Sequence, residues 1–236
     1  MKKTYLAAAI AATFAIQGTA FAQDYQMEAG LSYIDFDSDT AIGLDFTYFL
    51  ETVNTADRPL SEAYFLGRNN NLSASYVTFD EADVDGFGLG GEFWFDDIYA
   101  AASLSDVDGE QDFSARVGYM FSDNFLLNGG LADGDSYADP SVLVGAKYVA
   151  KLGENFVNLE ADLDLNDDNT LMLVGDYFFT NEFSAGVRVT ESDADGADTV
   201  FGVGARYFFT PVISGEVEYK TADSEDAYGL RVAARF

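Results

Sequence analysis

Apolar and polar residues alternate one by one through most of the chain, in segments of about ten residues. A β-strand points successive side chains to opposite faces, so this period of two predicts strands with one apolar and one polar face. We expect fourteen strands, near residues 25–35, 40–50, 71–80, 85–95, 97–105, 112–121, 124–132, 141–150, 155–165, 170–179, 182–190, 199–209, 211–221 and 227–236. Twelve strands is the alternative, because strand ends are predicted only to within a few residues.

The last ten residues carry the alternation to the end of the chain. Their apolar row is Tyr228, Leu230, Val232, Ala234 and Phe236. A membrane barrel can end in this way, because the apolar row faces lipid and the last aromatic ring lies at the interface. The segment resembles the C-terminal assembly signal of outer-membrane β-barrel proteins. This resemblance implies that the barrel-assembly machinery recognises the strand ending at Phe236. We therefore expect an all-β fold, a transmembrane antiparallel up-and-down β-barrel.

The first 22 residues have the order of a secretory signal peptide. Lys2 and Lys3 precede an apolar stretch, Tyr5–Ile16, and Ala20-Phe21-Ala22 forms a cleavage site of small residues. The apolar run is too short and too rich in alanine for a membrane anchor. We expect residues 1–22 to be removed on export and residues 23–236 to form one outer-membrane barrel.

The connections between the expected strands alternate in length. Tight turns are expected at Asp96-Asp97, Ser122-Asp123, Lys151-Leu152-Gly153-Glu154, Thr180-Asn181 and Thr210-Pro211, and longer acidic loops at 80–83, 106–110, 132–140, 191–198 and 222–227. Bacterial outer-membrane barrels have short periplasmic turns and longer extracellular loops. The strands that enter the tight turns end in aromatic residues, as in Gly91–Phe95 and Gly204–Phe209, which predicts an interfacial aromatic belt.

Charged residues share one face of the expected strands when the apolar rows are assigned to lipid. This inner row holds nine acids and seven bases: Glu28, Asp45, Glu92, Arg116, Lys147, Glu160, Asp162, Asp164, Asp176, Arg188, Arg206, Glu216, Glu218, Lys220, Arg231 and Arg235. The row suits either a water-filled lumen or a dense salt-bridge network, because an unpaired charge in a dry core is costly. Inward glycines such as Gly88, Gly90 and Gly204 leave room and favour the wet lumen.

A soluble lipocalin-like barrel or β-sandwich is the main alternative fold. Its apolar rows would turn inward, so it would bury Tyr48, Tyr119, Tyr148, Tyr177 and Tyr207 in one core while exposing glycine-rich rows. The membrane barrel explains both rows more simply.

Composition narrows the function further. The chain has no Cys and no His, which removes Ser-His and Asp-His catalysis and the commonest metal ligand. Carboxylate pairs such as Glu216 and Glu218, or Asp162 and Asp164, have the spacing of residues that face one lumen, so we expect no enzyme and no cofactor. The net charge is −29, and −31 without the first 22 residues, which argues against nucleic-acid binding.

Acidic loops hold most of the remaining carboxylates. Asp193, Asp195 and Asp198 resemble a fragment of a calcium loop, but the loop lacks the spacing and the terminal bidentate Glu of an EF-hand. We read these loops mainly as solvated segments and name the three aspartates only as weak metal candidates. Clustered carboxylates at one mouth should concentrate cations and repel anions, and could meet lipopolysaccharide through divalent ions.

Residues 58–76 (RPLSEAYFLGRNNNLSASY) break the alternation. Together with the leader, the recurrent strand ends and Phe236, this stretch resembles the small general porins of Gram-negative bacteria, and the resemblance implies a channel in the outer membrane. Leu60, Ala63 and Tyr64 have helical spacing, so residues 58–68 form either an ordinary periplasmic connection or a folded plug.

We therefore expect an outer-membrane porin, a passive diffusion channel for small hydrophilic solutes with weak cation preference. The candidate lumen residues for charge selection are Glu92, Arg116, Lys147, Asp176, Arg206 and Arg235. The alternative is a closed structural or adhesive outer-membrane barrel without an open pore. Outer-membrane lipid and lipopolysaccharide are the expected surroundings, and a homo-oligomer is left open.

Overall fold

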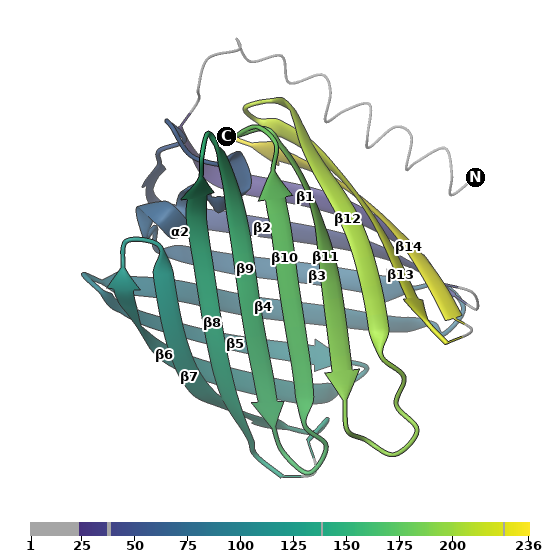
Figure 1. Cartoon of the computed structure of the whole chain (residues 1–236). Coiled ribbons are helices and arrows are strands. Elements are labelled where there is room, and N and C mark those ends of the chain that lie inside the picture. The colour runs from purple at the N-terminus through teal and green to yellow at the C-terminus, as the bar shows by residue number, and fades with distance from the viewer. Residues whose placement is uncertain (1–23, 37–38, 138, 224) are drawn as a thin grey trace.

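The computed structural model describes residues 24–36, 39–137, 139–223 and 225–236, and the expected signal peptide lies outside them. Within these residues, fourteen antiparallel strands follow one another around a closed barrel (Figure 1). They are β1 (Tyr25–Phe36), β2 (Thr40–Val53), β3 (Asn71–Phe79), β4 (Val84–Phe95), β5 (Ile98–Val107), β6 (Glu110–Ser122), β7 (Phe125–Gly134), β8 (Ser141–Leu152), β9 (Asn155–Leu165), β10 (Thr170–Phe178), β11 (Phe183–Ser192), β12 (Val200–Thr210), β13 (Ile213–Ala222) and β14 (Glu225–Arg235). The prediction of fourteen strands is confirmed, and the alternative of twelve is wrong.

The barrel closes between its first and last strands. β1 pairs with β14 in an unbroken antiparallel register from Glu28 opposite Arg235 to Phe36 opposite Ala227. Beyond this register, the backbone N–H of Phe236 donates to the carbonyl of Met27 at 2.9 Å. Closure matters because lipid offers no hydrogen-bond partner to an unpaired strand edge. The apolar row of residues 228–236 thus belongs to the strand that seals the barrel.

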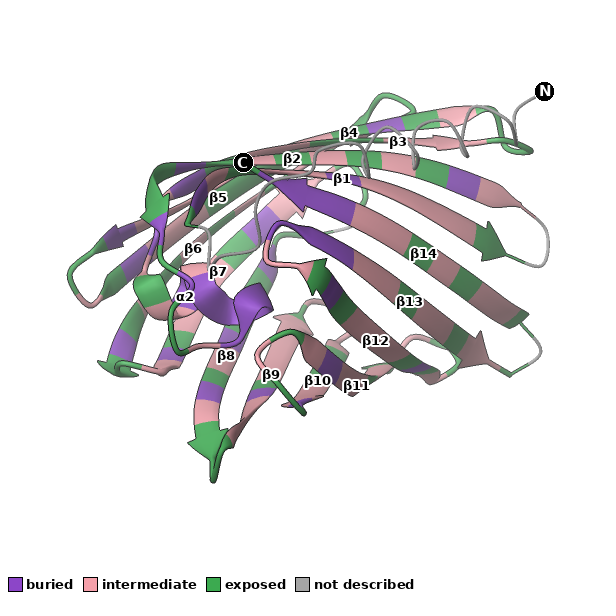
Figure 2. Ribbon diagram, turned by 90° about the horizontal axis from the view of Figure 1, so that it is seen from above, coloured by how far each residue is buried: buried purple, intermediate pink, exposed green. Residues whose placement is uncertain are grey.

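The outer face of the wall is apolar. Val117, Phe95 and Phe121 expose 66%, 63% and 62% of their surfaces, and exposed side chains alternate with less exposed ones along the strands (Figure 2). Tyr119 and Tyr148 also lie on this face, exposed by 48% and 40%. The fold with inward-facing tyrosines is therefore wrong, because these rings cover the outside of the barrel. No helix among the described residues is long and apolar enough to cross a membrane.

An aromatic belt follows the outside of the wall near the short turns, as predicted. The centres of neighbouring rings in this belt lie 4.9 to 6.2 Å apart. The rings form two rows, one of Tyr119, Phe121, Phe125 and Tyr148 and the other of Tyr177, Phe179, Phe183, Tyr207 and Phe209. One part of the prediction is wrong. Trp94 lies at the end of β4 but is only 8% exposed, because the alternation points it into the barrel.

The turns at the opposite end are shorter than the sequence suggests. The expected loop at 106–110 is a tight turn, because β5 runs to Val107 and β6 begins at Glu110. Asp108 and Gly109 have positive φ values of 54° and 87°, as a tight hairpin requires. The expected loop at 222–227 is shortened in the same way, because β13 ends at Ala222 and β14 begins at Glu225. Strand pairing extends further than hydrophobic alternation because backbone hydrogen bonds do not depend on side-chain type.

The connection between β2 and β3 folds into the mouth of the barrel. It contains the 3₁₀ turn η1 (Leu60–Glu62) and the one-turn helix α2 (Ala63–Gly67), which lie across the opening in Figure 2. Leu60, Ala63 and Phe65 are buried. Figure 1 places α2 at the same end of the barrel as the C-terminus. The folded plug is thus confirmed, and Leu60–Gly67 is called the plug below.

Candidate functional site

The plug rests on inward-facing apolar side chains at the short-turn ends of the strands. Phe65 packs in one cluster and Ala63 in another, and together the clusters include Tyr25, Phe49, Val53, Trp94, Tyr99, Met120, Leu126 and Val149 of the wall. We call these eight wall residues the apolar seat. Hydrophobic alternation alone assigns the inner row to charge and does not indicate the apolar seat. Strand alternation could have indicated part of the seat, because Trp94 lies two residues after Glu92 and so points to the same, inner face of β4.

Polar contacts tie the plug to strands that are distant in sequence. The backbone N–H of Leu60 donates to the carbonyl of Asn181 at 2.9 Å, and the Leu60 carbonyl accepts from Arg235 Nη1 at 3.0 Å. Glu62 Oε2 pairs with Lys147 Nζ of β8 at 2.8 Å. The plug is therefore fastened across the mouth from several sides.

Arg68 ends the plug and fastens it to two turns. Its backbone is left-handed, with φ of 53°, and closes the C-terminus of α2 through its N–H. Its guanidinium lies 2.7 Å from the carboxylate of Asp97 and 3.0 Å from that of Asp123. These pairs are partly exposed, so each contributes little alone, but they direct the chain back to the wall.

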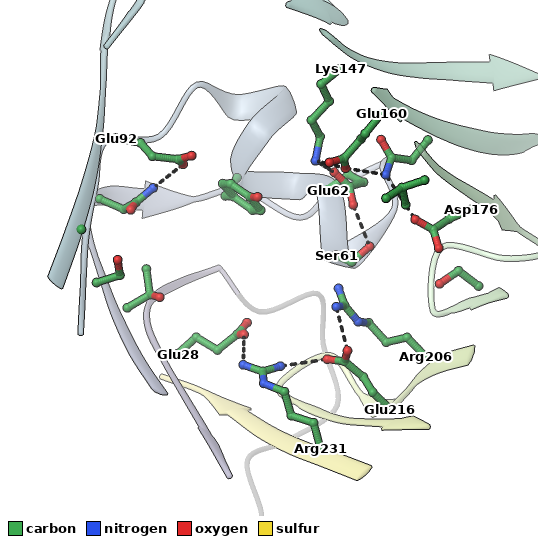
Figure 3. Close-up of a pocket in the computed structure, with 18 of the residues that line it drawn as sticks. Glu28, Ser61, Glu62, Glu92, Lys147, Glu160, Asp176, Arg206, Glu216 and Arg231 are labelled. Atoms are coloured by element: carbon green, nitrogen blue, oxygen red, sulfur yellow. Dashed lines mark hydrogen bonds and ion pairs between the residues drawn. The ribbon is translucent and has the colours of Figure 1, made fainter. Parts of the chain in front are cut away.

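A cavity of about 940 Å³ lies in the lumen beside the plug, and Figure 3 shows part of its lining. Ser61, Glu62 and Tyr64 contribute to its wall from the plug. All six residues that the sequence proposes for charge selection line this one cavity: Glu92, Arg116, Lys147, Asp176, Arg206 and Arg235. The structure thus brings these six residues together from six different strands, β4, β6, β8, β10, β12 and β14.

The first group of ion pairs is centred on Arg231 of β14. Its guanidinium lies within 3.1 Å of the carboxylates of Glu28, Asp45 and Glu216. Arg206 of β12 shares Glu216 at 2.9 Å. These contacts join β1, β2, β12, β13 and β14, so the group braces the wall on both sides of the closing seam.

Arg235 combines this ionic group with the apolar seat. Its guanidinium pairs with Glu28 at 2.6 Å and lies 4.4 Å and 4.5 Å from the ring centres of Tyr25 and Phe208. Stacking of this kind is favoured by a planar, weakly hydrated cation. Arg235 is only 6% exposed, so we expect its main effect to be positioning of the plug through Leu60.

The second group of ion pairs is centred on Lys147 of β8. Lys147 Nζ lies 2.8 Å from Glu62 and 2.9 Å from Glu160, so one cation holds a plug carboxylate and a wall carboxylate together. Asn158 Nδ2 donates to Glu160 at 2.7 Å and to Asp176 at 3.2 Å. The chain of contacts thus passes from the plug to β10.

The remaining inward bases are also paired. Arg188 lies 3.8 Å from Asp176 and 3.4 Å from Glu218, and Lys220 lies 3.1 Å from Glu218. The two interpretations of the inner row, a wet lumen and a salt-bridge network, therefore combine. The charges form a network, and the network surrounds a cavity.

The opposite wall, on β3 to β6, carries small neutral side chains. Ser103 and Ser114 lie 2.8 Å apart through their hydroxyls, and both line the main cavity with Ser73 and Gly90. A methyl group at Gly90 would lie 2.8 Å from the Ser73 hydroxyl, so this wall is packed with the smallest residues. We call these four residues the hydroxyl wall. The lumen thus has one densely ionic side and one side of mostly small neutral residues, on which Glu92 of β4 and Arg116 of β6 are the charged residues that line the cavity.

The weak metal candidates do not form a site. Among the described residues, no three acidic side chains gather in a way that could hold a metal ion. Asp193 instead accepts a hydrogen bond from Asn169 Nδ2 at 2.7 Å.

One loop carboxylate stabilises the end of the barrel opposite the plug. Asp39 accepts backbone hydrogen bonds from Thr40 at 2.6 Å, Glu81 at 2.8 Å and Ala82 at 3.2 Å. These donors, Glu81 foremost, lower the pKa of Asp39. The ionised side chain thus ties the β1–β2 connection to the β3–β4 turn.

Comparison with solved structures supports the barrel over nearly its whole length. A crystal structure of the outer membrane protein Omp33 of Acinetobacter baumannii is 25% identical, with a TM-score of 0.85 over 92% of this chain and 100% of that one. The KdgM porin in complex with oligogalacturonate is 12% identical, with a TM-score of 0.52 over 89% and 99%. A triple mutant of Rhodopseudomonas blastica porin is 13% identical, with a TM-score of 0.53 over the same shares. The last two show the fold alone.

A search of curated proteins found no match by sequence. The family model described as "Putative general bacterial porin" matches residues 1–139, more than half of the chain. The chain belongs to this general bacterial porin family, and it is a porin of the outer membrane.

Proposed function

We propose that this porin is a passive diffusion channel for small hydrophilic solutes, with a weak preference for cations. The observation that carries the proposal is the charged cavity of about 940 Å³ inside the barrel. Such a lumen keeps solutes hydrated while its fixed charges bias which ions enter.

The direction of the preference follows from the balance of charge. The inner row holds nine acids and seven bases, and Glu62 of the plug adds a tenth carboxylate. The acidic turns at the other end add to the negative potential, which concentrates cations and repels anions. Most of the lumen charges are paired, so their fields largely cancel, and we therefore expect the preference to be weak.

The six lumen residues divide into two kinds in this proposal. Two are carboxylates: Glu92 has no basic partner among the described residues, and Asp176 lies 3.8 Å from Arg188. Four are bases held in closer ion pairs: Arg116, Lys147, Arg206 and Arg235. We infer that the carboxylates attract cations and that the paired bases limit that attraction.

Planar-bilayer recordings of the refolded barrel test this proposal. In a potassium chloride gradient, the reversal potential should take the sign of cation selectivity, with a permeability ratio of about two to five. Strong anion preference would reject the proposed cation preference, and absence of any conductance would reject an open channel.

The plug favours the second candidate function, a closed structural or adhesive barrel without an open pore. Leu60, Glu62 and Arg68 each contact a different part of the wall, so the mouth is crossed at rest. Liposome swelling with small sugars separates the two functions. A channel admits the sugar, whereas a closed barrel leaves the liposomes unswollen.

Catalysis has no place in this proposal. The family and the fold are those of a channel. Both members of one carboxylate pair are occupied, since Glu216 binds Arg206 and Arg231, and Glu218 binds Arg188 and Lys220. In the other pair, Asp162 binds Arg116. These contacts support a role for the pairs in bracing the wall.

We also propose how the chain reaches and occupies the membrane. Residues 1–22 are removed on export, β14 with Phe236 is bound by the barrel-assembly machinery, and the apolar face meets outer-membrane lipid and lipopolysaccharide. Mass measurement of the protein from outer membranes tests the first step, and a mature chain that begins at Gln23 is the expected result.

A further inference from the structure

Glu92 differs from the other carboxylates of the main cavity. Among the described residues, no basic side chain lies within ion-pair distance of it, whereas the other acids of the cavity wall each pair with Lys or Arg. Glu92 instead accepts hydrogen bonds from Asn71 Nδ2 at 2.9 Å and from the Tyr99 hydroxyl at 2.8 Å. Figure 3 shows it on its own side of the cavity, apart from the other labelled charges. It is an oriented carboxylate without a counter-ion.

A second, smaller cavity of about 240 Å³ begins beside Glu92. Its aromatic lining consists of Tyr64, Phe65, Trp94 and Tyr99. The rings of Trp94 and Tyr99 lie 4.8 Å apart, and those of Trp94 and Phe65 lie 6.1 Å apart. Glu92 and Tyr64 line both cavities, so a solute in the lumen passes next to this pocket. Lys147 Nζ already lies 5.0 Å from the ring centre of Phe65 and 6.0 Å from that of Tyr64, so Trp94 and Tyr99 are the two rings of the pocket with no cation over them among the described residues. Aromatic faces beside a carboxylate are the surroundings that organic ammonium ions prefer.

The charges of the pocket also favour a cation. Glu92, Glu160 and Asp162 face Arg116 and Lys147 in its lining, an excess of one acid. Both bases are already occupied, Lys147 by Glu160 at 2.9 Å and Arg116 by Asp162 at 2.7 Å. The carboxylate that is left over is that of Glu92.

Trp94 supplies an independent sign of an unmet interaction in the same wall. Its side chain is 8% exposed, and its indole N–H has no acceptor among the described residues. A buried donor without a partner is uncommon in folded proteins. A hydroxyl oxygen on a bound solute could accept from this N–H after small movements of the neighbouring rings.

We propose that this pocket, formed by Glu92, Tyr64, Trp94 and Tyr99, is a subsite for small organic ammonium cations, with hydroxylated amines such as choline as the best fit. The subsite rests on the proposed function, because its ligand enters through the lumen and extends the cation preference to a named class of solute. Glu92 neutralises the ammonium group, and the aromatic rings contact its methyl or methylene groups.

The single tryptophan of the chain provides the test, because Trp94 is the only source of tryptophan fluorescence. The mature barrel, refolded in detergent, is titrated with choline chloride at an ionic strength held constant with sodium chloride. A saturable change in Trp94 emission is expected. The neutral isostere 3,3-dimethyl-1-butanol has the same shape without the charge, and it should bind at least about tenfold more weakly. Equal binding of the two compounds, or no saturable response to choline, overturns the proposal.

Two variants sharpen the result. Glu92→Gln keeps the shape and should weaken choline binding about tenfold or more, because the counter-ion is lost. Asp164→Asn is the matched control: Asp164 is another inward carboxylate without a basic partner among the described residues, and it contacts Ser141 instead. Its choline binding should match that of the unchanged protein, and equal effects of the two variants count against the pocket. If Glu92→Gln does not refold, the comparison of choline with its isostere still decides.

Binding and conduction separate the subsite from the proposed function. Cation-selective conductance without choline binding would support the channel and reject the subsite. Choline binding with no conductance would reject the open channel and support the subsite.

Discussion

Two levels of the same inner face differ in chemistry. At the short-turn end, the inward side chains form the apolar seat, as at Trp94 and Phe49, and they contact the plug. Further into the barrel, the inward side chains are ionic, as at Arg231 and Glu216, and they surround a cavity. Both sets of side chains come from the same strands and point into the barrel. Their chemistry therefore depends on what they contact, which is the plug at one level and water at the other.

Removing the plug tests this comparison most severely. Replacement of Leu60–Gly67 by a Gly-Ser linker of equal length should raise single-channel conductance about threefold or more, since a structured segment leaves the mouth. The apolar seat would then face water, so the barrel should also bind more of a hydrophobic dye. Unchanged conductance would show that the narrow part lies elsewhere.

Lys147→Met tests the bond between the plug and the ionic level. Lys147 holds Glu62 and Glu160, and the Glu62 side chain is 9% exposed. Leaving carboxylates of this kind without their partner typically costs about 3–5 kcal/mol. We expect noisier channels with a stronger cation preference, measured by the reversal potential, because a positive charge is lost. The double variant Lys147→Met, Glu62→Gln should recover part of the stability, and failure to recover any would contradict the pair.

Phe65→Ala tests the apolar level. Phe65 is 3% exposed and packs on Trp94, and truncation of a buried Phe costs about 3–5 kcal/mol in a cooperative core. Here the loss should appear as opening of the plug, seen as a red shift of Trp94 emission, while the β-sheet circular dichroism of the barrel is unchanged because Phe65 lies outside the strands. Phe121→Ala, on the lipid face and 62% exposed, is the control and should leave Trp94 emission unchanged.

Asp39 gives the smallest expected effect, at the end of the barrel opposite the plug. Its pKa is lowered by backbone donors, so its stabilisation is present above the ordinary pKa of Asp and is lost as pH falls through the lowered value. The amides of Glu81 and Ala82 should therefore lose protection against hydrogen exchange in acid, measured as the observed rate relative to the intrinsic rate at the same pH. Asp39→Asn should give faster exchange already at neutral pH, by about two- to fivefold. Hydrogen exchange of the plug amides should not change in this variant, because Asp39 lies at the opposite end of the barrel.

Much of the barrel could be predicted because its rule is local. Alternation with a period of two determines which side of the wall Tyr148 and Lys147 face, whatever lies on the neighbouring strand. The same rule gave the number of strands and the row of inward charges. It gave the turns less well, as at Asp108-Gly109, because strands lengthen through backbone pairing that side-chain pattern does not record.

Ion-pair partners could not be read in this way. Arg231 meets Asp45 at 2.6 Å although 186 positions separate them, because β14 and β2 flank β1 only after the barrel closes. The seat of the plug depends on the same closure, since Trp94, Met120 and Val149 converge from β4, β6 and β8.

The sequence by itself determined the wall of this protein: strands, their facing, and a lumen lined with charge. Only the tertiary structure decided that residues 60–67 close over one mouth, that Lys147 binds the plug and that Glu92 stays without a basic partner among the described residues. The physical reason is the distance along the chain over which each property is decided. Facing depends on neighbouring residues in the chain, whereas partners and cavities depend on which distant strands the closed barrel brings within a few ångströms.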